Sequence, residues 1–217
     1  MFCFQIIQTL MQEKMEMDSE TLEACKMGDK AAYASVYRIY YPRLYVYGCR
    51  FTNNYNLVED CIQEMFTNFW INRQKITVIN SFSSYLFISF RNNLVRDIQR
   101  QHKPIPKILY ENEYGFELDL SIDQVMIDAE RIFEQNVILN DALEKLTGRQ
   151  KEVIFLKFYE SLSYAEIASI LGISVKSTYK LFARAIDELR QSYQKKRTSS
   201  LFSVLYLLFS VKKLMSF

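Results

Sequence analysis

Apolar residues recur at three- and four-residue steps along most of the chain, which is the spacing of one face of an α-helix. The clearest case is residues 163–190, where Gly172 separates two such stripes. The residue that ends the first helix must take a positive φ, which a glycine such as Gly172 adopts at little cost. The hydroxyl of Ser174 can then cap the next helix. The pattern predicts one helix from Tyr164 to Leu171 and a second from Val175, packed on the first through Thr178, Phe182, Ala185 and Leu189.

The second of these helices carries cations and hydroxyls away from its apolar stripe, at Lys176, Ser177, Lys180 and Arg184. Such groups suit phosphates and base edges, and few carboxylates compete with them. Two helices joined by a short glycine turn are the geometry that seats the second helix in the major groove of DNA. The alternative is an ordinary helical hairpin whose charged face is only solvated.

Another amphipathic helix is predicted over residues 59–70, with a buried stripe at Cys61, Ile62, Met65, Phe66 and Phe69. Its exposed side gathers Asp60, Gln63 and Glu64. An acid–amide face beside a strong apolar face suits docking on a basic helical partner, and a solvated helix face is the alternative. Helical spacing also covers residues 18–50, where Pro42 suits the first turn of a new helix.

Residues 81–100 combine rings, cations and amides on one predicted helix, which Ser83 or Ser84 can cap. Its rings include Tyr85, Phe87 and Phe90. Its polar side chains include Arg91, Asn92, Asn93, Arg96 and Arg100. Cations hold a nucleic-acid backbone, rings stack on bases and amides read an unpaired base edge, so the composition is typical of gripping single-stranded DNA. We nevertheless expect most of these rings to be core, and the arginines and asparagines to be the residues that face the nucleic acid.

Composition narrows the fold class to all-α. The chain has 217 residues, 49% of them hydrophobic, so a packed core is expected in one large domain or two small ones. Only five Gly and three Pro are present, which disfavours a turn-rich β-sandwich or barrel.

The net charge of +2 indicates little about nucleic acid, but its distribution is informative. Residues 71–103 hold six Lys or Arg and one acid, residues 103–130 hold seven acids and two lysines, and residues 141–197 hold eleven bases and seven acids. This pattern predicts two DNA-facing domains on an acidic linker. The predicted segments are a frayed leader (1–17), a first domain (18–103), the linker (104–133), a second domain (134–197) and a hydrophobic tail (198–217).

The four cysteines form no CxxC pair, and His102 is the only histidine. A zinc site or a Cys/His catalytic pair is therefore not expected, and no glycine-rich loop is present to hold phosphate. We expect no metal, no cofactor and no catalysis by this chain. Reduced thiols fit a cytoplasmic protein.

The apolar tail, Leu201–Val211, is too short for the roughly twenty residues that a membrane-spanning helix needs. We expect it to pack on a partner or on the protein itself rather than insert stably in a membrane. The first residues lack a basic region before their apolar run and do not resemble a secretory signal.

Three ordered segments together resemble the extracytoplasmic-function (ECF) sigma factors of the sigma-70 superfamily, of the type common in Bacteroidetes. They are EDCIQEMFTNFW, YLFISFRNN and LTGRQKEVIFLKFYESLSYAEIASILGISVKSTYKL, and the resemblance spans about residues 19–193. It implies an all-α transcription initiation factor with a region 2-like and a region 4-like helix-turn-helix domain. The implied partners are core RNA polymerase, promoter DNA and an anti-sigma factor.

The resemblance also implies roles for individual residues. The face that docks on the polymerase clamp helices corresponds to Asp60, Gln63 and Glu64. The part that captures and melts the −10 element corresponds to Arg91, Asn92, Asn93, Arg96 and Arg100. The reader of the −35 element corresponds to Lys176, Ser177, Tyr179, Lys180 and Arg184. The acidic linker is similar to the segment that threads the polymerase toward its RNA exit channel.

Two positions depart from the family pattern and bear on which bases are read. An Asp often follows the Arg-Asn pair by four residues, and here Arg96 stands there with Asp97 beside it. The usual Gly-Thr-Val-Lys of the reader helix ends here in Tyr179, and a lysine follows at Lys180.

Two other functions stay open from the sequence. One is a stand-alone regulator whose C-terminal module resembles that of LuxR-type proteins, with a sensor or dimerisation domain before it. The arginine–asparagine helix and the acid–amide face weigh against it, because such an activator needs neither. The other, a membrane-attached interaction protein, depends only on the tail.

Overall fold

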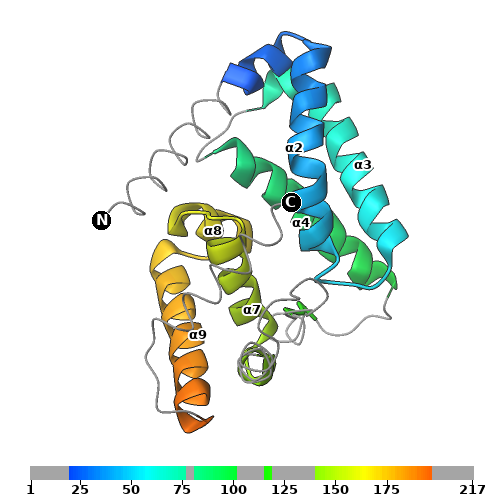
Figure 1. Ribbon diagram of the computed structural model, residues 1–217. Coiled ribbons are helices and arrows are strands. Elements are labelled where there is room, and N and C mark those ends of the chain that lie inside the picture. Colours follow the sequence, from blue (N-terminus) through cyan, green and yellow to red (C-terminus); the bar gives the residue numbers. More distant parts are fainter. Residues whose placement is uncertain (1–19, 77–80, 102–114, 119–139, 197–217) are drawn as a thin grey trace, which may run out of the picture. The chain divides into compact units, whose positions relative to one another are not determined.

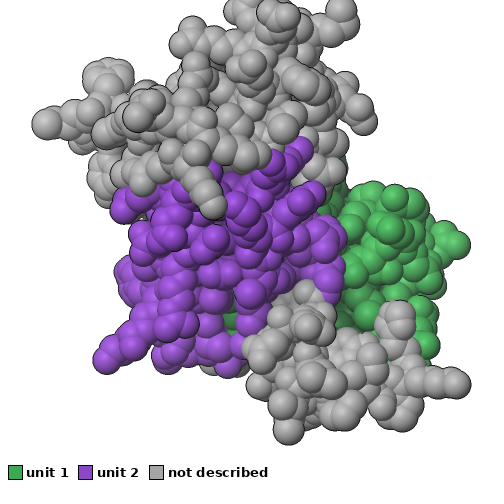
Figure 2. All heavy atoms as spheres, turned by 90° about the horizontal axis from the view of Figure 1, so that it is seen from below, with its two compact units in different colours: residues 1–104, 169–171 green, residues 105–168, 172–217 purple. Residues whose placement is uncertain are grey.

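The computed structural model describes residues 20–76, 81–101, 115–118 and 140–196 (Figure 1). The chain divides into two compact units, residues 1–104 with 169–171 and residues 105–168 with 172–217 (Figure 2). The described residues form helices and connecting turns without a β-strand, so the all-α prediction is confirmed. The predicted leader, the tail and most of the predicted linker lie outside the described residues.

Three long helices build the first unit: α2 (Lys30–Gly48), α3 (Tyr55–Asn72) and α4 (Phe82–Gln101). Each packs on the other two, and Figure 1 shows them side by side in blue, cyan and green. A helical segment at residues 20–26 precedes α2, and the 3-10 turn η1 (Arg73–Lys75) follows α3. The buried stripe predicted for α3 is confirmed, since each of its five residues is at most 2% exposed.

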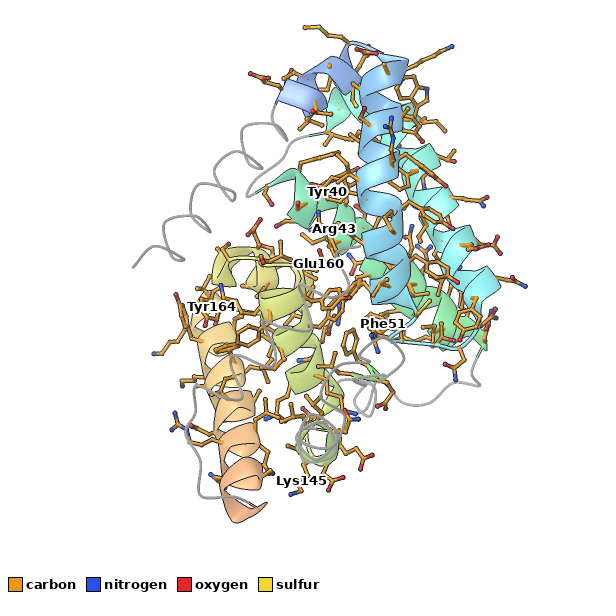
Figure 3. All side chains as sticks on the ribbon, viewed as in Figure 1. Tyr40, Arg43, Phe51, Lys145, Glu160 and Tyr164 are labelled. Atoms are coloured by element: carbon orange, nitrogen blue, oxygen red, sulfur yellow. The ribbon has the colours of Figure 1, made fainter. Side chains whose placement is uncertain are left out.

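Aromatic rings fill the core between these helices. The Tyr47 ring lies 5.2 Å from that of Phe87 and 6.2 Å from that of Phe90. Such pairs stabilise by about 0.5–1.5 kcal/mol beyond the area they bury. The Tyr40 hydroxyl shares a 2.7 Å hydrogen bond with Ser83, so both polar groups are satisfied inside the core. Tyr40 and Arg43, labelled on α2 in Figure 3, form a cation–π contact at 4.9 Å.

Pro42 lies inside α2, so the prediction that it begins a new helix is wrong. A proline in a helix interior costs about 3 kcal/mol, because it removes one backbone hydrogen bond and crowds the preceding turn. Buried side chains lie on both sides of it, Val36 and Tyr40 before and Leu44 and Tyr47 after. Full burial of one such aliphatic side chain stabilises by about 1.5–3 kcal/mol. Packing along the whole length of α2 therefore outweighs the cost of the proline.

The prediction for the start of α4 is also corrected. The Ser81 hydroxyl accepts a 3.1 Å hydrogen bond from the Ser84 backbone N–H, so Ser81 is the cap, and Ser83 and Ser84 are buried within the helix. Phe87 and Phe90 are fully buried, so the expectation that most rings of this helix are core is confirmed for both. The face of α4 that carries them is the one packed on its neighbours.

The second unit contains α7 (Gly148–Ile154), the π-helical turn η2 (Phe155–Tyr159), α8 (Tyr164–Leu171) apart from its last three residues, and α9 (Val175–Lys196). Residues 140–144 form a further helical turn before α7. The predicted break between the first two of these helices is confirmed, with Thr147 as N-cap in a capping box with Gln150. The η2 turn closes with a hydrogen bond from the Glu160 N–H to the Phe155 carbonyl at 3.3 Å.

The turn between α8 and α9 has the predicted geometry. Gly172 has a φ of +65°, and the Ser174 hydroxyl accepts from the Ser177 N–H at 3.1 Å. Of the predicted packing stripe, Thr178 and Ala185 are fully buried, Leu189 is 1% exposed and Phe182 is half-buried. The helix-turn-helix predicted from residues 163–190 is therefore present, with α9 extending to Lys196.

One described part of the predicted linker, residues 115–118, is anchored within the second unit. The Phe116 ring is 1% exposed and lies 5.7 Å from the Phe155 ring. Lys151 Nζ pairs with Glu117 Oε2 at 2.7 Å. A buried ring and a partly buried ion pair therefore attach this piece of the acidic segment to α7 and η2.

Cys61 connects α3 and α4, because its thiol donates to Asp97 Oδ2 at 3.8 Å. Burial, followed by the charge of Asp97, raises the pKa of Cys61 to about 12. Because folding raises the pKa of the Cys61 thiol, the folded state favours its protonated form. The raised pKa therefore contributes to folding stability below the ordinary pKa of 9.0, and this contribution is lost as the pH rises toward 12.

We predict that Gly48→Ala destabilises the protein. A Cβ at this position would lie 2.6 Å from Val58 Cγ1 and 2.8 Å from Phe90 Cζ, so the neighbours must shift. Overpacking costs about 1–3 kcal/mol, against a helix-propensity gain of at most about 1 kcal/mol. Thermal unfolding followed by circular dichroism should show a lower midpoint. Gly115→Ala is the control, since its Cβ would meet nothing within 4 Å, and equal midpoints for both variants would contradict this packing.

We also predict that Cys61 resists alkylation in the folded protein. Its side chain is 1% exposed and its pKa of about 12 leaves almost no thiolate at neutral pH, while the thiolate is the reactive form. Iodoacetamide at pH 8 with mass-spectrometric readout should label half-buried Cys49 first. In denaturant the two thiols should react alike, and fast labelling of native Cys61 would refute the prediction.

Candidate nucleic-acid interface

The five residues predicted to read duplex DNA lie together on the exposed side of α9, opposite the buried stripe: Lys176, Ser177, Tyr179, Lys180 and Arg184. The three cations follow one another at four-residue intervals, which places them in one row along the helix. No acidic side chain occupies the first turn of α9. The positive end of the helix dipole and this row of cations therefore act in the same direction on an approaching phosphate.

The α4 helix presents a second positive face. Of the five residues predicted there, Asn92, Arg96 and Arg100 are exposed, and Arg91 and Asn93 are half-buried. The buried face on the other side of the helix holds it against α2 and α3. The structure therefore brings Asn92, Arg96 and Arg100 to the surface, leaves Arg91 and Asn93 half-buried, and takes the phenylalanines into the core.

Asp97 is a member of this face to which the sequence analysis assigned no role. Its Oδ1 atom accepts hydrogen bonds from Arg96 Nε and Arg100 Nη1, each at 3.3 Å. The carboxylate thus holds two guanidinium groups while its other oxygen receives the Cys61 thiol. The three-residue spacing of Asp97 and Arg100 on a helix was the available signal, since side chains at that spacing lie on one face.

The predicted acid–amide face of α3 is exposed at Asp60, Gln63 and Glu64. This face forms an ion pair with α4, because Glu64 Oε1 lies 4.0 Å from Arg96 Nη2. The side chains of the pair are 51% and 46% exposed, so its contribution to stability is at most about 1 kcal/mol. The pair nevertheless places the acid of one predicted surface beside a cation of the other.

Neither a metal-binding group nor a membrane-spanning segment is found among the described residues. No three His, Cys, Asp or Glu side chains there gather closely enough to hold a metal ion. None of the described helices has the length and apolar character to cross a membrane.

Two family descriptions match the chain in order: Sigma-70 region 2 over residues 36–103 and Sigma-70 region 4 over residues 136–189. The ECF RNA polymerase sigma factor SigW of Bacillus subtilis is 26% identical over 188 residues, covering 81% of this chain and 96% of SigW. The ECF RNA polymerase sigma factor RpoE of Cereibacter sphaeroides is 23% identical, covering 75% of this chain and 87% of RpoE.

Solved structures have the same fold. CnrH, in complex with the cytosolic domain of CnrY, aligns with a TM-score of 0.55 at 19% identity and covers 83% of this chain and 99% of CnrH. The sigma factor RpoE of Bartonella quintana, in complex with the anti-sigma factor NepR, aligns with a TM-score of 0.51 at 17% identity, covering 76% and 98% of the respective chains. With both sigma-70 regions present in order and relatives matched along most of their length, this chain belongs to the ECF group of the sigma-70 family of transcription initiation factors.

Proposed function

We propose that this sigma factor directs core RNA polymerase to promoters by reading the −35 element as duplex DNA with α9 and melting the −10 element with α4. The observation that carries the proposal is a cationic face on each unit, borne by a helix whose opposite side is buried core. Lys176, Lys180 and Arg184 form one face, and Arg96 and Arg100 belong to the other.

At the −35 element, the cations of α9 hold the phosphates and set the register of the helix in the major groove. Side chains near the start of α9, between Ser177 and Lys180, then reach the base edges. Each good base contact discriminates by about 1–3 kcal/mol. The buried stripe on α8 and α9 keeps this reading face rigid, because Thr178 and Ala185 cannot turn outward without opening the core.

At the −10 element, Arg96 and Arg100 hold the backbone of the opened strand, and Asn92 and Asn93 meet the edge of an unpaired base. Asp97 orients the two guanidinium groups and lowers the positive charge of this face. Such a face favours DNA that the polymerase has already delivered over free duplex.

For the remaining partners, the proposal assigns Asp60, Gln63 and Glu64 to docking on a basic helical element of core polymerase. The domains extend over 18–103 and 134–197, and the acidic linker (104–133) threads the polymerase toward its RNA exit channel. An anti-sigma factor is proposed as regulator, since RpoE of Bartonella quintana was solved with one. Because its proposed partner is core RNA polymerase, the proposal also locates the protein in the cytoplasm.

We predict that Asp60→Lys weakens binding to core polymerase at least tenfold, because it removes one opposite charge and adds a like charge against a basic partner. Glu20→Lys is the matched control, an equal charge change at an exposed residue before α2. Affinity measured by fluorescence anisotropy, together with promoter-directed transcription by the reconstituted holoenzyme, provides the readout. Absence of any specific transcript with wild-type protein, together with unchanged affinity for Asp60→Lys, would reject the proposed function.

We further predict that Lys180→Ala and Arg184→Ala weaken promoter binding by the holoenzyme without changing the unfolding midpoint, because both side chains are exposed. Each lost phosphate contact should reduce the slope of log affinity against log salt by about 0.9. Lys30→Ala, the removal of an exposed cation on α2, should leave both binding and slope unchanged. If both α9 variants gave the same footprint as the wild-type protein, the proposal that α9 reads the −35 element would be rejected.

A further inference from the structure

Tyr179 has an exposed ring that packs against a neighbouring ring. Its side chain is 53% exposed and lies between Lys176 and Lys180 on the cationic side of α9. Its ring centroid lies 4.0 Å from that of Tyr164, with 34° between the ring planes. Figure 3 labels Tyr164 at the start of α8, beside the first turns of α9. A large ring that is held on one side and open on the other can meet a ligand with little loss of rotamer freedom.

Tyr164 is itself fixed from two further directions. The Phe182 ring meets it edge-on at 5.4 Å and 77°. Lys157 Nζ lies 4.7 Å from its ring centroid and donates to the Leu162 carbonyl at 3.0 Å, which keeps the cation in place. Burial raises the pKa of Tyr164 and lowers the pKa of Lys157. The η2 turn thus supports Tyr164, and Tyr164 supports Tyr179.

We propose that Tyr179 determines specificity by packing its ring against the C5-methyl group of a thymine in the major groove, with Tyr164 as its positioning residue. The inference rests on the proposed −35 reading by α9 and names the chemistry that one residue reads. Among the four bases only thymine presents a methyl group in the major groove, and apolar side chains recognise it there.

The residues next to Tyr179 contact the DNA backbone, whereas the Tyr179 ring contacts a base. Lys176 and Lys180 supply cations for phosphates, which position a helix without reading sequence. The lysines on either side of Tyr179 have flexible stems and strongly hydrated charges. The ring offers neither charge nor flexibility. Its contribution therefore depends on which base lies opposite rather than on the backbone.

The experiment uses the full chain in holoenzyme with core polymerase. A preferred −35 duplex is first selected from a random pool, and each thymine in it is then replaced singly by deoxyuridine, which removes only the methyl group. For wild-type protein we expect one thymine whose replacement weakens binding about fourfold, the worth of one buried methyl group. In Tyr179→Ala that ratio should fall to about one, while Tyr179→Phe should retain it because the ring remains.

Two further variants separate positioning from folding. Tyr164→Leu should lower the thymine-to-deoxyuridine ratio, and Tyr164→Phe should restore it, because the supporting ring is restored. A purely structural role for Tyr164 would reduce affinity for both duplexes equally and leave the ratio unchanged. Tyr55→Ala is the control for losing an exposed ring, since Tyr55 is 55% exposed at the start of α3, and it should behave as wild type.

The outcomes are distinguishable. A selected duplex whose binding is insensitive to every deoxyuridine, or a ratio that persists in Tyr179→Ala, overturns the inference while leaving −35 reading by α9 in place. Loss of the ratio in Tyr179→Phe would show that the hydroxyl is the reader and would also overturn it. If no duplex is selected at all, the proposed function fails and this inference fails with it.

Discussion

Burial of one face of each helix is the constraint from which the surface chemistry of this protein follows. In the first unit the apolar faces of α2, α3 and α4 meet around Tyr47 and Phe90, and in the second unit Thr178 and Ala185 close the helix-turn-helix. Side chains three or four residues apart share one face of a helix, and the residues that lie off the buried face point outward. The positions of the cations and acids are therefore set by the core, and a slip in packing would move them all together.

The charges on the first unit form one connected set rather than two independent surfaces. Glu64 reaches Arg96 from α3, and Asp97 holds Arg96 and Arg100 within α4. Exposed pairs of this kind contribute little to folding stability. Their significance is electrostatic, because a polybasic face without carboxylates would bind any nucleic acid. A cationic face moderated by Asp97 fits a protein that meets promoter DNA as part of a polymerase complex.

Family membership settles the choice between the functions that the sequence left open. A stand-alone LuxR-type regulator has no use for sigma-70 region 2, and residues 36–103 match that region while residues 136–189 match region 4. The assignment to the Bacteroidetes type, the domain boundaries and the individual site residues stay predictions.

Local signals were enough to predict α8, the start of α9 and the turn between them, because a glycine at positive φ and a capping Ser174 act within a few residues of themselves. Three features needed the tertiary structure. Pro42 continues α2 because both halves of that helix are buried, Phe87 is one of the α4 rings that belong to the core, and the Tyr179 ring is held by Tyr164. Each depends on side chains that folding brings together from different helices or from both ends of one long helix. Helical periodicity along the chain does not predict these contacts.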